Sequence, residues 1–223
     1  TFFKVVYRRH TNFAMESIEQ TFNGTADFGK KVTCTISRNG DLIHRVYLQV
    51  TLPAVDVSDY TMGDGVSASI GASDSTMLFR WVNYVGHALV KNVELEIGGQ
   101  RIDKQYGDWL NIWNELTQPA GHQVGYDMMV GNSAHLTGSG KSSTEATTLY
   151  VPLQFWFCRN PGLALPLIAL QYHEVKINLE FRQKEECYVL GDANNGTQTT
   201  NARKAVESLV AASLFVDYIY LDT

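Results

Sequence analysis

The chain has 223 residues, 44% of them hydrophobic, with a formal net charge of -5 and a pI near 5.6. That length suits one large all-β domain or two small ones and can bury a substantial core, while the acidic balance argues against a general nucleic-acid coat protein. No run of eighteen apolar residues and no signal peptide occur, so we expect no membrane span. Because the sequence begins with Thr1 and not with Met, we expect a piece of a longer protein.

Apolar and polar residues alternate with a period of two along much of the chain, which is typical of half-buried strands. The alternation is clearest in "HEVKINLEFR", where the apolar side chains from Val175 to Phe181 face one way and the charged ones face the other. In the sixth strand Pro152 cannot donate a ladder hydrogen bond, which indicates a sheet edge or a bulge. The pattern predicts eight strands, near residues 12–22, 30–37, 42–52, 92–97, 100–104, 149–158, 173–182 and 212–221.

Two glycine-containing dipeptides predict turns between strands. Asn39-Gly40 lies between the second and third predicted strands, and both residues tolerate positive φ, so we expect an antiparallel hairpin there. Gly98-Gly99 predicts a tight turn that leads the fourth strand into the fifth.

Two short stretches have helical periodicity. Residues 108–116, "DWLNIWNEL", have Asp108 as an N-cap and an apolar face formed by Trp109, Ile112, Trp113 and Leu116. Residues 75–86, "STMLFRWVNYVG", suggest a second helix that ends at Gly86. Neither is placed at regular strand–helix–strand spacing, which disfavours a doubly wound parallel sheet.

Three segments rich in small polar residues are expected to be surface loops: 53–75, 118–147 and 184–207. With eight antiparallel strands, they predict an all-β fold. We expect an eight-stranded antiparallel jelly-roll sandwich with long loops and one or two short helices, formed by residues 1–223 as a single domain.

The stretch "TGSGKSST", residues 137–144, contains half of a phosphate-binding motif. The complete motif needs a further glycine five residues before Gly140, and His135 stands there. A helix should follow, but the next residues are rich in β-branched side chains and end at Pro152. We therefore predict a surface loop in which Lys141 binds no nucleotide.

No other constellation predicts catalysis or metal binding, and we expect no catalytic, cofactor-binding or metal residue. Glu94 and Glu96 share a strand face, but such pairs are commonplace on a solvated face. The odd count of cysteines and the lack of a C-x-x-C pair favour reduced, mostly buried thiols. The histidines form no H-x-H or H-E-x-x-H pattern. The residues concerned are Cys34, Cys158, Cys187, His10, His44, His87, His122, His135 and His173.

Several features allow two interpretations. The sequons at Asn23 and Asn195 are expected to be unmodified, and the basic group Lys4, Arg8, Arg9 and His10 to be a solvated face. The apolar run 162–170 is either core packing or a subunit contact. Two other functional classes stay open: a carbohydrate-binding jelly roll and a cupin-like metalloenzyme. The spacing of Asp56, Asp59 and Asp64 does not fit a calcium loop, and the missing H-x-H opposes the metalloenzyme.

Five blocks of the sequence carry a family resemblance. They are "FFKVVYRRHTNFAMESIEQ", "ISRNGDLI", "VELEIGGQRIDKQYGDW", "YVPLQFWFCRNPGLALPLIALQYHEVKINLEF" and "LFVDYIYLDT". In these blocks, which run in order from residue 2 to residue 223, the chain resembles the major capsid proteins of nucleocytoplasmic large DNA viruses. The algal-virus and iridovirus members are the most similar.

The resemblance implies a structural protein and not an enzyme. Members of this family are double jelly rolls that form homotrimers, and each trimer is a pseudo-hexagonal capsomer of an icosahedral shell. This chain would be the first of the two jelly rolls. Its location would be the virion capsid, assembled in the host cell cytoplasm. Its partners would be its own copies, neighbouring capsomers and minor capsid proteins, with no cofactor and no direct nucleic-acid binding.

The loop composition adds an expectation about assembly. Ordering polar, glycine-rich loops in a contact costs conformational entropy for little apolar burial. We therefore expect assembly through the sandwich flanks and the run 162–170. Shortening residues 137–146 should leave oligomerisation intact, whereas Leu167→Asp should abolish it or prevent folding.

Overall fold

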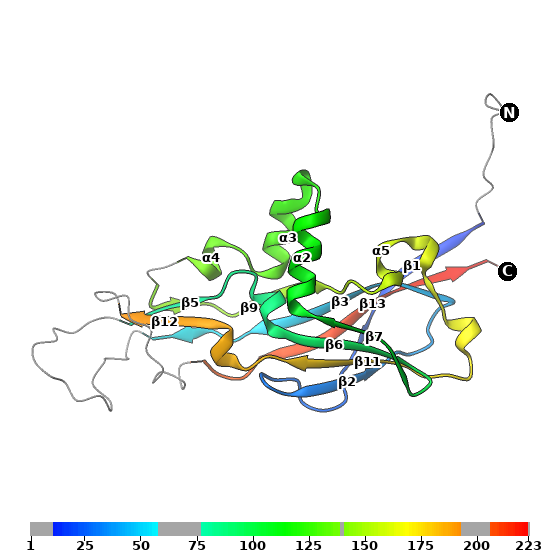
Figure 1. The fold of residues 1–223 in the computed structure, drawn as a ribbon, viewed down its shortest axis with the longest axis horizontal. Coiled ribbons are helices and arrows are strands. Elements are labelled where there is room, and N and C mark those ends of the chain that lie inside the picture. The colour runs from blue at the N-terminus through cyan, green and yellow to red at the C-terminus, as the bar shows by residue number, and fades with distance from the viewer. Residues whose placement is uncertain (1–10, 58–76, 139–140, 193–205, 223) are drawn as a thin grey trace, which may run out of the picture.

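The computed structural model describes residues 11–57, 77–138, 141–192 and 206–222 (Figure 1). Some of the residues discussed above lie outside these ranges: Lys4, Arg8, Arg9, His10, Asp59, Asp64 and Asn195. The strands are β1 (Phe13–Gln20), β2 (Lys31–Thr35), β3 (Leu42–Leu52), β4 (Val55–Asp56), β5 (Met77–Trp81), β6 (Val90–Ile97), β7 (Gln100–Tyr106), β8 (Ser143–Thr144), β9 (Thr147–Pro152), β10 (Leu165–Pro166), β11 (Val175–Phe181), β12 (Tyr188–Asp192) and β13 (Ala211–Leu221). The α-helices are α1 (Val85–Leu89), α2 (Gly107–Thr117), α3 (Gln123–Val130), α4 (Ala134–Thr137) and α5 (Trp156–Arg159).

Two antiparallel sheets form the body of the fold. The first has the order β1-β13-β3, with β9 and β10 both pairing along the far edge of β3, and the second has the order β2-β11-β6-β7. Consecutive strands β1, β2 and β3 alternate between the two sheets, as the Greek keys of a jelly roll require. Figure 1 shows the two sheets lying over one another along the long axis of the molecule. The prediction of an all-β antiparallel jelly roll is confirmed.

The core lies between the sheets and consists of the side chains that the period of two predicted. From the first sheet, the cross-strand pair Leu48 and Leu214 is fully buried, and from the second sheet so is the pair Leu95 and Ile177. Each such side chain contributes about 1.5–3 kcal/mol when it leaves water, so dozens of them dominate the stability of the sandwich.

The predicted strand 149–158 ends early. Strand β9 stops at Pro152, which has no N–H to continue the ladder with β3, and β9 lies at a sheet edge as expected for a proline-containing strand. The chain then turns into α5. Phe155 and Phe157 are buried all the same, with their rings stacked 5.6 Å apart. The apolar alternation that predicted a strand here therefore continues through a turn and a helix whose side chains face inward. It does not mark one continuous strand.

The helix predicted over residues 75–86 was wrong. Residues Met77–Trp81 form strand β5, which pairs with β12, and the helix α1 begins only at Val85. Phe79 and Trp81 are both buried, with their rings edge to face at 5.2 Å. Two aromatic side chains that are buried with a period of two outweigh the weak helical pattern of this short segment.

The hairpin predicted at Asn39-Gly40 was also wrong, because β2 and β3 belong to different sheets. The turn crosses between the sheets, and Gly40 passes close to β13. A Cβ at Gly40 would lie 3.0 Å from the Cβ of Tyr218. The dipeptide therefore serves a close approach of two segments. The Gly98-Gly99 turn does join paired strands, β6 and β7, with φ of 60° and 83°.

Segment 118–147 is not a loop. It contains a 3-10 helix (Ala120–His122), then α3, α4 and β8, so the molecule has more helix than the predicted one or two short elements. The helix predicted at 108–116 is confirmed as α2. Figure 1 shows α2 and α3 projecting together from one side of the sandwich. Within the described ranges, no helix has the length and apolar character needed to cross a membrane.

Candidate assembly surfaces

The Gly-Lys-Ser stretch does not form a phosphate cradle in its described part. The backbone of Lys141 is extended and its carbonyl accepts a hydrogen bond from the N–H of Phe79 at 2.8 Å. The Lys141 ammonium donates to the carbonyl of His135 at 2.8 Å. After Ser142 the chain enters strand β8 and not a helix. This geometry supports the prediction that Lys141 binds no nucleotide, which remains to be tested.

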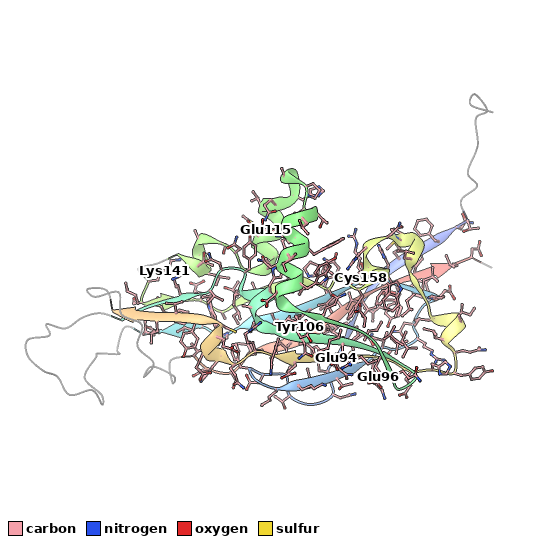
Figure 2. All side chains as sticks on the ribbon, viewed as in Figure 1. Glu94, Glu96, Tyr106, Glu115, Lys141 and Cys158 are labelled. Carbon is pink, nitrogen blue, oxygen red and sulfur yellow. The ribbon has the colours of Figure 1, made fainter. Side chains whose placement is uncertain are left out.

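The three cysteines are free thiols. Cys34 and Cys187 are buried and Cys158 is half-buried on α5 (Figure 2). Burial raises the pKa of Cys34 to about 11 and the pKa values of Cys158 and Cys187 to about 12. Nucleophilic chemistry requires the thiolate, so these thiols are poor nucleophiles near neutral pH.

Glu94 and Glu96 lie on the outer face of the second sheet (Figure 2). Three cations surround the Glu94 carboxylate: Lys104 at 2.9 Å, and Lys31 and Arg101 at 3.4 Å. The hydrogen bond from Lys104 is the main cause that lowers the pKa of Glu94, although burial opposes it. A carboxyl group in a general acid needs a raised pKa, so this one is a structural anion.

The same sheet face is a continuous polar network. Asn178 on β11 accepts from the Thr33 hydroxyl at 2.7 Å and donates to Glu96 at 3.2 Å. Glu180 accepts from Lys91 at 2.5 Å and from Asn92 at 2.7 Å. These bonds tie β2, β11 and β6 together across their outer side. The result is a stiff face whose charges are already paired within the chain.

A groove of about 430 Å³ lies where α2, α3 and α5 meet the outer side of β3. Its lining includes Arg45, Trp113, Asn114 and Arg159, and it contains no carboxylate and no histidine. The Arg159 guanidinium lies over the Trp113 ring at 4.2 Å. A general acid–base pair is therefore missing from this groove. Elsewhere among the described residues, no group of three histidine, cysteine or acidic side chains is arranged to hold a metal ion.

Helix α2 exposes part of the face that its sequence pattern marked as apolar, while Trp109 and Trp113 on that face are half-buried. Ile112 is 50% exposed and Leu116 is 74% exposed, whereas the polar Asn114 is buried against the body. On the neighbouring α3, Val124 and Met128 are also largely exposed. Large aliphatic side chains on two projecting helices are costly to leave in water, which is typical of a contact surface.

The apolar run 162–170 divides between the two interpretations left open above. Leu165 and Leu167 are buried in the core, where Leu167 is only 2% exposed. Leu163 and Ile168 point outward, with Ile168 69% exposed. The run therefore supplies core packing through one set of side chains and an exposed apolar surface through the other. Leu167→Asp would test folding more than assembly.

A third exposed apolar surface lies on strands β1 and β13. Phe13 and Met15 on β1, and Leu221 at the end of β13, are all exposed. Sequence reasoning predicted a strand near residues 12–22 but did not mark these side chains. The signal that could have found them is the alternation of the large apolar residues Phe13 and Met15 within the first of the matching sequence blocks.

Comparison with known proteins identifies the family to which this jelly roll belongs. The family model described as "Major capsid protein N-terminus" matches residues 1–222. The major capsid protein of Phaeocystis pouchetii virus is 56% identical over the whole chain, which covers 45% of that protein. For the major capsid protein of Pyramimonas orientalis virus the identity is 58% and the coverage 48%.

A solved structure, the quasi-atomic model of the PBCV-1 virus capsid, matches the whole chain. The TM-score is 0.68 at 37% identity, and the match covers 46% of that chain. The chain thus spans about half the length of the relatives it matches. The jelly roll, the paired outer charges and the identity along the full chain have one common explanation: the chain belongs to the family of viral major capsid proteins and corresponds to their N-terminal part.

Proposed function

We propose that this chain is the first of two jelly rolls in a major capsid protein, which forms homotrimeric, pseudo-hexagonal capsomers of an icosahedral shell. The observation that carries the proposal is the combination of a rigid sandwich with several exposed apolar surfaces. A subunit that is surrounded by other protein in a shell can leave such surfaces on its own fold, because the neighbours cover them.

The described residues offer little support for a catalytic role. The groove beside α2 lacks an acid–base pair, and the Glu94 carboxylate is neutralised by three cations. We therefore propose a structural protein of the virion without enzymatic activity and without a cofactor. Its partners would be its own copies, neighbouring capsomers and minor capsid proteins, with assembly in the host cytoplasm and without direct nucleic-acid binding.

The test uses the full-length protein. Size-exclusion chromatography with light scattering should give three times the mass of one chain, and negative-stain electron microscopy should show particles with a pseudo-hexagonal outline. Metal analysis of the same sample checks the alternative of a cupin-like metalloenzyme. A monomer at micromolar concentration, or stoichiometric iron or zinc, would contradict the proposal.

A further inference from the structure

Strands β1 and β13 form an exposed ribbon at the edge of the first sheet. Phe13 pairs with Leu221, and Met15 pairs with Ile219 two residues further along. Directly paired residues in an antiparallel ladder point to the same face, so these four side chains lie together, with Ile219 buried and the other three exposed. Phe13 is 63% exposed, Met15 is 52% exposed and Leu221 is 43% exposed. We call these three residues the ribbon patch.

The ribbon also has a free strand edge. Strand β1 ends the order β1-β13-β3, and among the described residues no strand pairs with its other side. Residues 13–17 are exposed one after another, so both faces of the ribbon are uncovered there. An exposed edge strand with large apolar side chains favours association. Glu16 points to the opposite face and accepts from the Tyr220 hydroxyl at 3.4 Å. On the face of the patch, the nearest charges along the ribbon are Asp217 and Glu19.

The two ends of the described structure meet at this patch. The Asp222 N–H donates to the carbonyl of Asn12 at 3.1 Å, and the Asn12 amide donates to the Asp222 carboxylate at 3.3 Å. Figure 1 shows β1 and β13 running out side by side toward the C label. The relatives continue for about as many residues again as this chain matches, and the matching family model is their N-terminus. In a longer protein, the following segment would therefore start next to the ribbon patch.

That position decides between possible occupants. A segment tethered a few residues from the patch has an effective concentration in the millimolar range, whereas a second copy must bind from solution at its own concentration. Burial of three large apolar side chains would stabilise either contact, so the tether gives the advantage to the segment that follows in the same chain.

We propose that the ribbon patch is the docking site for the part of the capsid protein that follows residue 223, within the same chain. This inference rests on the proposed function in one respect, namely that the chain is the N-terminal part of a longer protein. The partner surface would be apolar, and a strand of it could add to the free edge of β1 by main-chain hydrogen bonds.

Thiol labelling of the full-length protein tests whether the patch is covered. Met15→Cys is compared with Ala146→Cys, because Ala146 is also exposed on this fold and lies in the segment 137–146 that is expected to take no part in assembly. The native thiols contribute little, since burial raises their pKa values to about 11 or 12. Met15→Cys should react with a maleimide more slowly than Ala146→Cys by about tenfold or more, since labelling would need the contact to open. Equal rates would overturn the proposal.

Crosslinking identifies the occupant. A maleimide photocrosslinker on Met15→Cys should give a product that migrates as a single chain, with the crosslinked peptide located after residue 223. A crosslink between two chains, or only to residues before 223, would overturn the proposal. Phe13→Cys serves as a second variant in case Met15→Cys fails to fold. If the protein forms no trimers but the intrachain crosslink is present, the proposed capsid function fails and the docking site stands.

Discussion

Gly107 is the residue at which the structure makes its sharpest prediction for a small substitution. It begins α2 directly after β7, and the helix there crosses the end of α1 and the start of β6. A Cβ at Gly107 would lie well inside 3.0 Å of the carbonyl oxygens of His87 and Val90. Both are backbone atoms in buried residues, so neither can rotate away as a side chain could. Gly107→Ala therefore forces α2 to shift on the body.

The expected cost of Gly107→Ala is that of overpacking, about 1–3 kcal/mol. For a domain of this size, that lowers the melting temperature by about 2–4 °C per kcal/mol. The matched control is Gly125→Ala on α3, where a Cβ meets no atom within 4 Å. There alanine should raise stability by up to about 1 kcal/mol through helix propensity. Differential scanning calorimetry of the unassembled protein measures both. If Gly107→Ala melts at or above the parent temperature, the packing described for α2 is wrong.

Four other substitutions test three separate parts of the structure. Leu167→Asp places a charge in the core and should abolish soluble folded protein. The exposed neighbour provides the control, because Ile168→Asp should fold normally as measured by circular dichroism. A folded Leu167→Asp protein would contradict the assignment of this side chain to the core. Burial lowers the pKa of His87 from 6.5 to about 4. Below pH 6.5 the unfolded chain therefore takes up a proton that the folded chain does not, and the free energy of unfolding falls as the pH drops toward 4. Urea unfolding at pH 7 and pH 5 should show a loss of about 2 kcal/mol from this group, and His87→Asn should remove it; an unchanged pH dependence in the variant would show that His87 is not the cause. Lys141→Ala should not change ATP binding by calorimetry, because neither protein should bind it; micromolar binding that the substitution abolishes would restore the phosphate-loop interpretation.

The strands could be predicted because one physical rule decides them. A side chain between two sheets must be apolar and its neighbours must face out, so the period of two in β3, β11 and β13 is imposed by the core itself. The family resemblance added the identity of the fold. Where two rules competed, sequence reasoning failed. Residues 77–81 satisfied a helical spacing and a strand alternation at once, and only the burial of Phe79 against Trp81 decides for the strand.

The turn at Asn39-Gly40 shows a second kind of failure. The preference of this dipeptide for hairpins is local, whereas the actual constraint is a contact with Tyr218, almost 180 residues away in the chain. The small polar segment 118–147 failed for a similar reason. Its composition resembles a loop, but α3 packs on β9 and buries Val130. This long-range packing stabilises the helix despite the composition of the segment.

Helix α2 connects these observations to assembly. Its period of 3.6 correctly predicted a helix with an apolar face, and for an isolated globular protein that face should have been buried. The fold instead covers the two tryptophans of that face only in part and leaves Ile112 and Leu116 in solvent. These apolar side chains of α2 are not covered by the fold itself. They imply a contact with a surface that lies outside this fold. The ribbon patch has the same property on a strand with a period of two. Both patterns are expected where part of the burial that a sequence encodes is completed outside the fold, at the ribbon patch by the proposed following segment of the same chain and at α2 by neighbouring protein.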